Sequence, residues 1–202
     1  MTRDKINTEK KILEAARKVF LKKGKDGARM QEIANEAGIN KALLHYYFRS
    51  KDKLFIAIFD EALDEFIPRI GSVLNSDMSL FDKIRDFTNH YIEFFIENPL
   101  LPLFIFHEIR NNPDRIVKLA GQSGVEPILF AEEISRAVDN GLINPVDPRQ
   151  LIVNMISLCI FPFVGQPLVE AFLFNNDDEK FADFIEIRKK EVGEFIINSI
   201  KK

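Results

Sequence analysis

Residues 29–48 read RMQEIANEAGINKALLHYYF, and this stretch decides the fold. Its first apolar residues recur at i, i+3, i+4 and i+7, which predicts a short helix with one buried stripe. Gly38 follows the stripe and can adopt the left-handed conformation that ends a helix and turns the chain. Asn40 can then cap a second helix with its side-chain oxygen. The sequence therefore predicts a helix-turn-helix. The stripe consists of Met30, Ile33, Ala34 and Ala37.

The second predicted helix has two chemically different faces. Leu44 and Phe48 lie one turn apart and are expected in the core. The opposite face offers a cation, an imidazole and phenol rings, which a DNA major groove can accept. The two-helix pattern alone fits a plain helix pair of an all-α protein equally well. The residues predicted to contact DNA are Arg29, Gln31, Lys41, Ala42, Leu43, His45, Tyr46, Tyr47 and Lys51.

The charges are distributed unevenly along the chain. The net charge of −3 argues by itself against a nucleic-acid partner. Residues 1–60, however, hold 14 Lys and Arg against 8 Asp and Glu, a net charge of +6, and residues 61–202 carry −9. This distribution would attract the basic residues 1–60 to DNA phosphates and hold the acidic residues 61–202 away from them. Lys51 fits this picture, because a cation in the first turn of a helix opposes the helix dipole unless an anion such as a DNA phosphate joins it.

The motif and its flanks resemble the N-terminal domain of the TetR family of bacterial repressors. The resemblance covers the first quarter of the chain in detail; beyond it only the helical plan and the length match. The family usually has threonine at the position of Arg29, and often glycine at Ala42 and tyrosine at His45. These departures predict an altered sequence preference. The agreement lies at Ile12-Leu13, Ala15-Ala16, Phe20, Gly24, Ile33-Ala34, Ala37 to Lys41, Leu44, Tyr47-Phe48, Ser50-Lys51 and Leu54-Phe55.

The remaining sequence predicts an all-α fold of nine or ten helices with no sheet. We expect a three-helix DNA-binding head over residues 1–50 and a helical ligand-binding and dimerisation body over residues 51–202. Proline, glycine and capping residues set the expected helix ends. The predicted helices outside the motif are 8–23, 51–70, 79–97, 100–109, 127–138, about 147–161 and 179–200, with a linker at 71–77 and caps at Ser79, Asp147 and Asp178.

The resemblance implies a homodimer, because two heads must span two half-sites of a palindromic operator in double-stranded DNA. The last two helices carry more apolar surface than one helix pair needs, although all of it could face the monomer core. The predicted dimer face consists of Ile152, Ile156, Ile160, Phe184, Ile185, Val192, Phe195 and Ile196.

The resemblance also implies a small-molecule effector, of unknown identity. Nineteen Phe and no Trp indicate an aromatic core or an aromatic-lined cavity for a flat or oily molecule. Each candidate side chain, taken by itself, could equally well be an ordinary residue of the hydrophobic core. The predicted pocket residues are Phe87, His90, Tyr91, Phe94, Phe104, His107, Cys159 and Phe163.

Several classes of protein are excluded. His107-Glu108 does not begin a His-Glu-x-x-His zinc motif, because Asn111 stands where the second His is required. Three His and one Cys make a structural zinc site improbable, and no phosphate loop or dinucleotide fingerprint is present. Residues 151–174 contain polar residues and prolines, which predicts a broken, buried helix and no membrane span. One cysteine and no signal-peptide core suit the cytoplasm.

These observations predict a cytoplasmic, homodimeric, ligand-responsive DNA-binding regulator, by family a repressor, with no catalytic site, metal or cofactor. The alternative is a helical small-molecule-binding protein that does not bind DNA.

Overall fold

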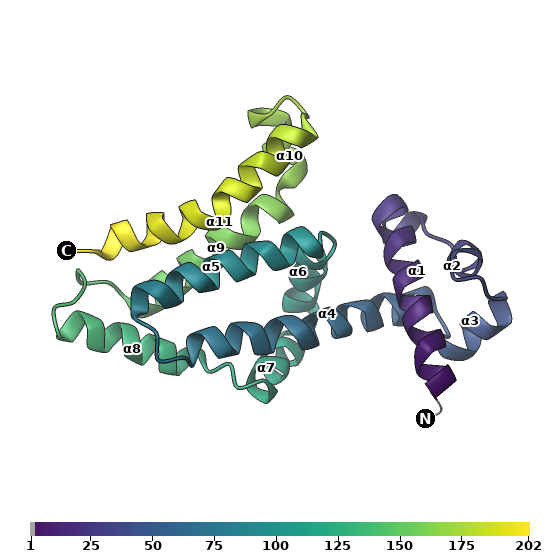
Figure 1. The fold of residues 1–202 in the computed structure, drawn as a ribbon, viewed down its shortest axis with the longest axis horizontal. Coiled ribbons are helices and arrows are strands. Elements are labelled where there is room, and N and C mark those ends of the chain that lie inside the picture. Colours follow the sequence, from purple (N-terminus) through teal and green to yellow (C-terminus); the bar gives the residue numbers. More distant parts are fainter. Residues whose placement is uncertain (1–2) are drawn as a thin grey trace. The chain divides into compact units, whose positions relative to one another are not determined.

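A computed structural model describes the backbone of residues 3–202 and the side chains from residue 7 onwards, except those of Leu103 and His107. Within this part the chain is all-helical, and an isolated bridge between Ile143 and Lys201 is its only β pairing (Figure 1). The described helices are α1 (Arg3–Gly27), α2 (Met30–Glu36), α3 (Lys41–Tyr47), α4 (Lys51–Leu74), α5 (Leu80–Glu97), α6 (Leu101–Asn111), α7 (Pro113–Gln122), α8 (Pro127–Asp139), α9 (Pro148–Val164), α10 (Gln166–Leu173) and α11 (Asp178–Ile200).

The chain divides into two compact units, Met1–Leu63 and Asp64–Lys202, and the division falls inside α4. In the first unit α1, α2, α3 and the first half of α4 enclose one small apolar core. Its members come from the helical stripes that the sequence predicts, because each of these short helices can bury only one face. The most deeply buried of them are Ile12, Ala16, Phe20, Ile33, Ala34, Leu44 and Leu54.

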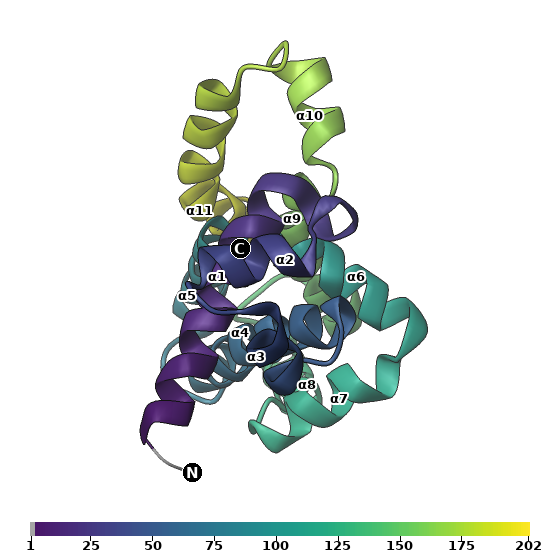
Figure 2. The ribbon, with the colours of Figure 1, turned by 90° about the vertical axis from the view of Figure 1, so that its right-hand side faces the viewer.

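The second unit is organised around α5. This helix buries its apolar face and packs against α9 and α11, while α8 packs against α9 and α6 against α7. In Figure 2 the chain rises through α10, turns, and descends through α11. Asn175 and Asn176 make that turn with positive φ angles of 53° and 58°, which asparagine tolerates better than most residues.

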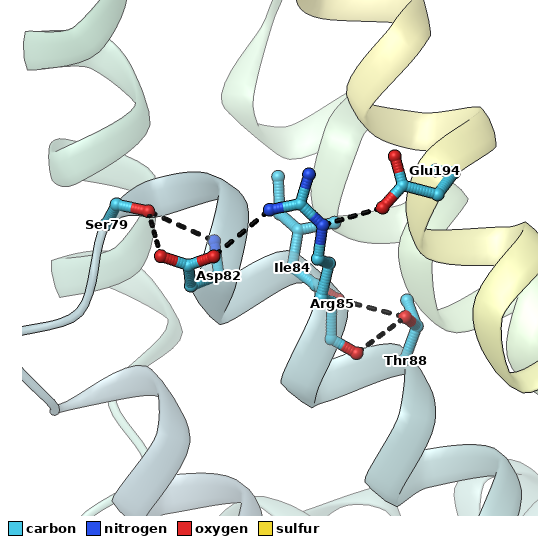
Figure 3. A network of polar contacts seen from close by, with 6 residues as sticks. All are labelled: Ser79, Asp82, Ile84, Arg85, Thr88 and Glu194. Atoms are coloured by element: carbon cyan, nitrogen blue, oxygen red, sulfur yellow. Dashed lines mark hydrogen bonds and ion pairs between the residues drawn. The ribbon is translucent and has the colours of Figure 1, made fainter.

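Arg85 ties α5 to α11 (Figure 3). Its Nε atom donates to Glu194 Oε1 at 2.6 Å and its Nη1 atom to Asp82 Oδ1 at 3.0 Å. Asp82 also accepts from the Ser79 hydroxyl at 2.6 Å, and this bond, together with Arg85, lowers the pKa of the Asp82 carboxyl. The hydrogen bond from Arg85 likewise lowers the pKa of Glu194. The helices come so close that Gly193 of α11 faces Thr88 and the Arg85 backbone of α5.

Two of the predicted helices have other bounds in the structure. Helix α1 begins at Arg3, five residues before the predicted start at residue 8. Helix α4 passes through Pro68 and Gly71 to Leu74, so the predicted linker at 71–77 is largely helical. Pro68 is exposed, and the buried Ile70 and Val73 continue the apolar stripe beyond it. Packing of this stripe thus outweighs the hydrogen bond that the proline removes.

The last helices also differ from the prediction. Helix α9 continues through Pro162 to Val164 before Gly165 ends it, and α10 follows as a separate helix. Asp177, not Asp178, caps α11 by accepting from the Lys180 N–H at 3.1 Å. The described part therefore has eleven helices, more than the nine or ten expected.

In the described residues no single helix has both the length and the apolar composition needed to cross a membrane. Helices α9 and α10 meet that test only when taken together, and they are bent by 75° at the break between them.

Candidate nucleic-acid interface

The turn between α2 and α3 is built by backbone hydrogen bonds around a left-handed glycine. Gly38 has φ +65°, and the N–H of Ile39 donates to Ala34 O at 3.0 Å, which closes the end of α2. Asn40 then starts α3: its Oδ1 accepts from the Leu43 N–H at 2.8 Å. The two sequence signals predicted for this turn are therefore confirmed, and they fix the direction in which α3 leaves it.

Helix α3 presents the predicted two faces. Leu44 and Phe48 are 0 % and 7 % exposed and anchor the helix in the core of the first unit. Tyr46 is 68 % exposed, and its ring meets that of Tyr47 edge-on at a centroid distance of 5.5 Å. The structure thus brings the predicted α3 contacts together on the outer face and flanks of one helix. Lys41, Ala42, His45 and Tyr46 are exposed, and Leu43 and Tyr47 are half-buried.

Helix α2 begins with Arg29, whose guanidinium has no acceptor atom to cap the helix. Instead, the Arg29 backbone N–H donates to Glu32 Oε2 at 3.2 Å, and Glu32 also accepts from Lys23 Nζ at 2.7 Å. The bond from Lys23, and then that from Arg29, lower the pKa of Glu32. The exposed Gln31 donates to Asn35 Oδ1 at 2.9 Å. Both predicted contact residues, Arg29 and Gln31, therefore lie at the exposed start of α2.

Part of the positive charge of the first unit is neutralised within the protein. Four cations form ion pairs with acidic residues of the same unit, whereas Lys41, Arg49 and Lys53 have no ion pair to a described residue. These three exposed cations lie at the start of α3, in the link between α3 and α4, and in the first turn of α4, positions from which they could reach phosphates. Arg49 and Lys53 are absent from the predicted contacts, although their charge was visible in the sequence. The pairs are Arg17–Glu61, Lys18–Glu36, Lys23–Glu32 and Lys25–Asp52.

Lys51 has partners that the sequence did not reveal. Its ammonium donates to the backbone carbonyls of Asp26 and Ala28, at 3.1 Å each. These carbonyls lie after the left-handed Gly24, where the chain leaves α1. The bonds give a reason within the protein for a lysine in the first turn of α4, so the argument that a phosphate explains this residue better is wrong. A contact between Lys51 and DNA stays a prediction.

We expect Lys51→Met to lower the free energy of unfolding by about 1 kcal/mol, because two carbonyls lose a charged donor while the apolar stem is retained. Urea denaturation followed by circular dichroism measures the change. Lys53→Met is the matched control, since the Lys53 side chain is exposed and has no described ion pair. Equal midpoints for the two variants would contradict a stabilising role for Lys51.

Four of the predicted pocket residues, Phe87, Tyr91, Phe94 and Phe163, belong to an aromatic cluster of the second unit. Phe66 stacks on Phe94 at 4.3 Å between ring centroids and meets Tyr91 edge-on at 5.1 Å. Phe95 meets Tyr91 at 4.9 Å and Phe163 at 5.3 Å. Phe66 and Phe95 join the cluster but were not predicted to line the pocket, because the sequence does not say which rings of α4 and α5 meet.

The polar groups of this cluster are strongly desolvated. Burial raises the pKa of the Cys159 thiol to about 12, and burial, followed by the nearby Cys159, raises the pKa of Tyr91. The buried Nδ1 atom of His90 has no hydrogen-bond partner in the described part of the chain. Phe87 and Phe104 are buried, and the side chain of His107 lies outside the described residues.

Half of the predicted dimer face belongs to the core of the chain itself. Ile160, Ile185, Val192 and Ile196 are all less than 9 % exposed, so their prediction as interface residues is wrong. An apolar helical stripe can be buried in the core of one chain or in an interface between two chains. Here α11 packs against α5 and α9, and these residues are buried in the core. Phe195 is 66 % exposed and Ile156 39 %, while Ile152 and Phe184 are half-buried.

Three comparisons agree on one group of proteins. Residues 12–58 match the family model described as bacterial regulatory proteins, tetR family. The chain is 29 % identical over 145 residues to the HTH-type transcriptional regulator RutR of Escherichia coli K12, an alignment that covers 71 % of this chain and 68 % of RutR. It is 42 % identical to the HTH-type transcriptional repressor NicS of Pseudomonas putida over 59 residues, 29 % of this chain and 28 % of NicS.

Solved structures share the fold. A transcriptional regulator of the TetR/AcrR family from Thermobifida fusca superposes with a TM-score of 0.65 at 17 % identity, over 93 % of this chain and 97 % of that one. The hemolysin II transcriptional regulator HlyIIR superposes with a TM-score of 0.61 at 23 % identity, over 97 % and 98 %.

Proposed function

We propose that this chain, which belongs to the TetR family of bacterial regulatory proteins, binds a palindromic operator as a homodimer in the cytoplasm and represses transcription there. Members of this family are helix-turn-helix transcriptional regulators and not enzymes. The observation that carries the proposal is the outer face of α3, where Lys41, His45 and Tyr46 stand exposed on a helix held by a capped turn. Side chains of this kind can read base edges and reach phosphates.

The test is selection of binding sites from random duplex DNA with the purified protein, followed by affinity measurements at several salt concentrations. We expect an inverted repeat, since a two-fold dimer reads two equivalent half-sites. The logarithm of the affinity should fall steeply with the logarithm of the salt concentration, because phosphate contacts release counterions. Absence of any enriched sequence would favour the alternative, a small-molecule-binding protein without DNA binding.

His45→Ala is expected to relax the base preference at one position of each half-site, by about tenfold, because a hydrogen-bonding group is lost from the reading face. Competition between the selected operator and single-base variants measures this discrimination. Glu14→Ala, an exposed change on α1, serves as the control. An unchanged preference profile for His45→Ala would remove this residue from the predicted reading face.

For dimerisation we propose the exposed apolar side chains of α9 and α11. Val153 and Ile187 are 58 % and 63 % exposed, alongside Ile156 and Phe195. Exposed apolar surface on this scale typically marks a protein interface. A groove of about 240 Å³ runs between the two helices, and Leu158 and Phe195 line it.

Phe195→Asp is expected to weaken the dimer by about thirtyfold or more, the effect of losing an aromatic anchor at an interface. Sedimentation across a dilution series measures the dissociation constant. Leu142→Asp is the matched control, because Leu142 is 67 % exposed and lies outside α9 and α11. The interface assignment fails if both variants retain the dissociation constant of the unchanged protein.

We further propose that a largely apolar or aromatic effector binds at the aromatic cluster around Tyr91 and Phe94 and changes the affinity for DNA. The unpartnered Nδ1 atom of His90 supports this, because a ligand hydroxyl could supply the missing hydrogen bond. A coupling of about 1–3 kcal/mol between ligand and DNA would be enough for regulation. Flat aromatic compounds that raise the melting temperature should do so less in Phe94→Ala.

A further inference from the structure

The second unit contains a cavity of about 410 Å³ that shares no lining residue with the aromatic cluster. It lies between the C-terminal end of α4, the start of α5, the loop before α8, and α8 itself. Asn75 fastens its rim by donating to Gly124 O at 2.8 Å. The volume is in the range of pockets that take small organic molecules. The lining residues that matter for its chemistry are Lys83, Glu126, Leu129, Phe130, Glu132 and Glu133.

The charges around the cavity leave a negative excess. Lys83 is 5 % exposed, and its ammonium lies 2.7 Å from Glu133 Oε2, so the protein neutralises it internally. Glu132 pairs at 3.9 Å with Arg136, one turn further along α8. Glu126 has no ion pair with any described residue. The carboxylate of Glu126 is therefore not neutralised by a described residue. The cavity also lies in residues 61–202, which carry a net charge of −9.

The cavity also has an apolar side. Leu129, which is 49 % exposed, and the buried Phe130 line it, both on α8. A metal ion does not fit these surroundings, since the described residues contain no group of three or more His, Cys, Asp or Glu able to hold one. For an anion the balance of charge is unfavourable, because the three carboxylates of the lining outnumber its two cations, Lys83 and Arg136. An organic cation with an apolar portion needs no group of metal ligands, and the negative excess attracts it.

We propose that this cavity binds a small organic cation, with its ammonium group on Glu126 and its apolar portion on Leu129 and Phe130. The site is a second small-molecule site, separate from the proposed effector cluster. Association needs no change in the Lys83–Glu133 pair, which stays intact as part of the wall.

The test uses three compounds of matched size, 4-phenylbutylamine, 4-phenylbutanol and 4-phenylbutyrate, titrated calorimetrically into the full chain at pH 7 without DNA. We expect the amine, which is protonated at this pH, to bind at least about tenfold more tightly than the alcohol. The carboxylate should bind more weakly still. Equal affinity of amine and carboxylate would overturn the proposal. Because DNA is absent, this outcome is independent of whether the chain binds an operator.

Three variants locate the site. Glu126→Gln should weaken the amine about tenfold and leave the alcohol unchanged, whereas Glu65→Gln, an exposed change of equal charge on α4, should affect neither. Leu129→Trp should fill the cavity and abolish binding of both compounds, with an unchanged circular dichroism spectrum because Leu129 is half exposed. Retention of amine binding in Leu129→Trp, or equal losses in the two Gln variants, would place the cation elsewhere and overturn the proposal.

Discussion

Gly193→Val is expected to lower the free energy of unfolding by about 3 kcal/mol, at the upper end of what overpacking a core costs. A Cβ atom at this position would lie 2.9 Å from Thr88 Oγ1 and 3.3 Å from Arg85 Cα. The second distance concerns backbone, which cannot rotate away. Helix α5 cannot easily retreat either, because the Arg85–Glu194 bond holds it to α11 next to the clash. Valine adds two methyl groups beyond the Cβ atom, at a position where the Cβ atom alone is already too close to α5.

Gly193→Ala separates the steric cost from helix propensity. Alanine gains about 1 kcal/mol over glycine inside a helix, so a net loss in this variant would come from the contact with α5. Gly121→Ala is the matched control, since a Cβ atom on Gly121 of α7 meets nothing within 4 Å. It should be neutral or stabilising.

The double variant Gly193→Ala/Thr88→Ala removes the nearer clash. The hydroxyl of Thr88 donates to carbonyls of its own helix, Ile84 O and Arg85 O at 3.0 Å each, so its loss breaks no hydrogen bond between helices among the described residues. Denaturant unfolding of the unchanged protein, the single variants Gly193→Ala and Thr88→Ala, and the double variant should give a favourable coupling of about 1 kcal/mol. Strictly additive effects would show that α5 and α11 are not in close contact at this point.

The features that the sequence predicted correctly depend on neighbours in the chain. The left-handed Gly38, the caps at Asn40 and Ser79, and the cap at Asp147 each act within three residues of their own position. Such signals are legible in a single sequence because the atoms that interact are close along the chain. The helix-turn-helix consists almost entirely of them, which is why it could be predicted in detail.

The features that were missed depend on contacts between distant residues. Gly71 lies inside α4 where a Cβ atom would be 3.1 Å from Ser123 O, so a glycine expected in a linker instead permits close packing of segments fifty residues apart. Lys51 meets carbonyls more than twenty residues earlier. The buried Ile185 and Ile196 show the same limit, since an apolar stripe does not reveal whether its partner is this chain or another copy.

The double charge reversal Lys41→Glu/Arg49→Glu is expected to reduce operator affinity by roughly a thousandfold at 0.1 M salt. Both side chains are exposed, and neither has an ion pair to a described residue. Their positive charge is therefore available to phosphates, unlike that of Lys18 or Lys23, which face Glu36 and Glu32. A dimer would lose four such contacts, two in each head.

Salt dependence distinguishes this mechanism from a general loss of binding. Each lost phosphate contact lowers the slope of log affinity against log salt by about 0.9, so the loss of four contacts should lower the slope by about 3 to 4. Arg110→Glu/Lys118→Glu changes the net charge by the same amount at exposed positions of α6 and α7 and should leave affinity and slope nearly unchanged. Equal losses in the two double variants would mean that net charge, and not the position of Lys41 and Arg49, governs attraction to DNA. A large loss of affinity with an unchanged slope would instead point to a disturbed fold of the first unit, which circular dichroism on the same samples would reveal.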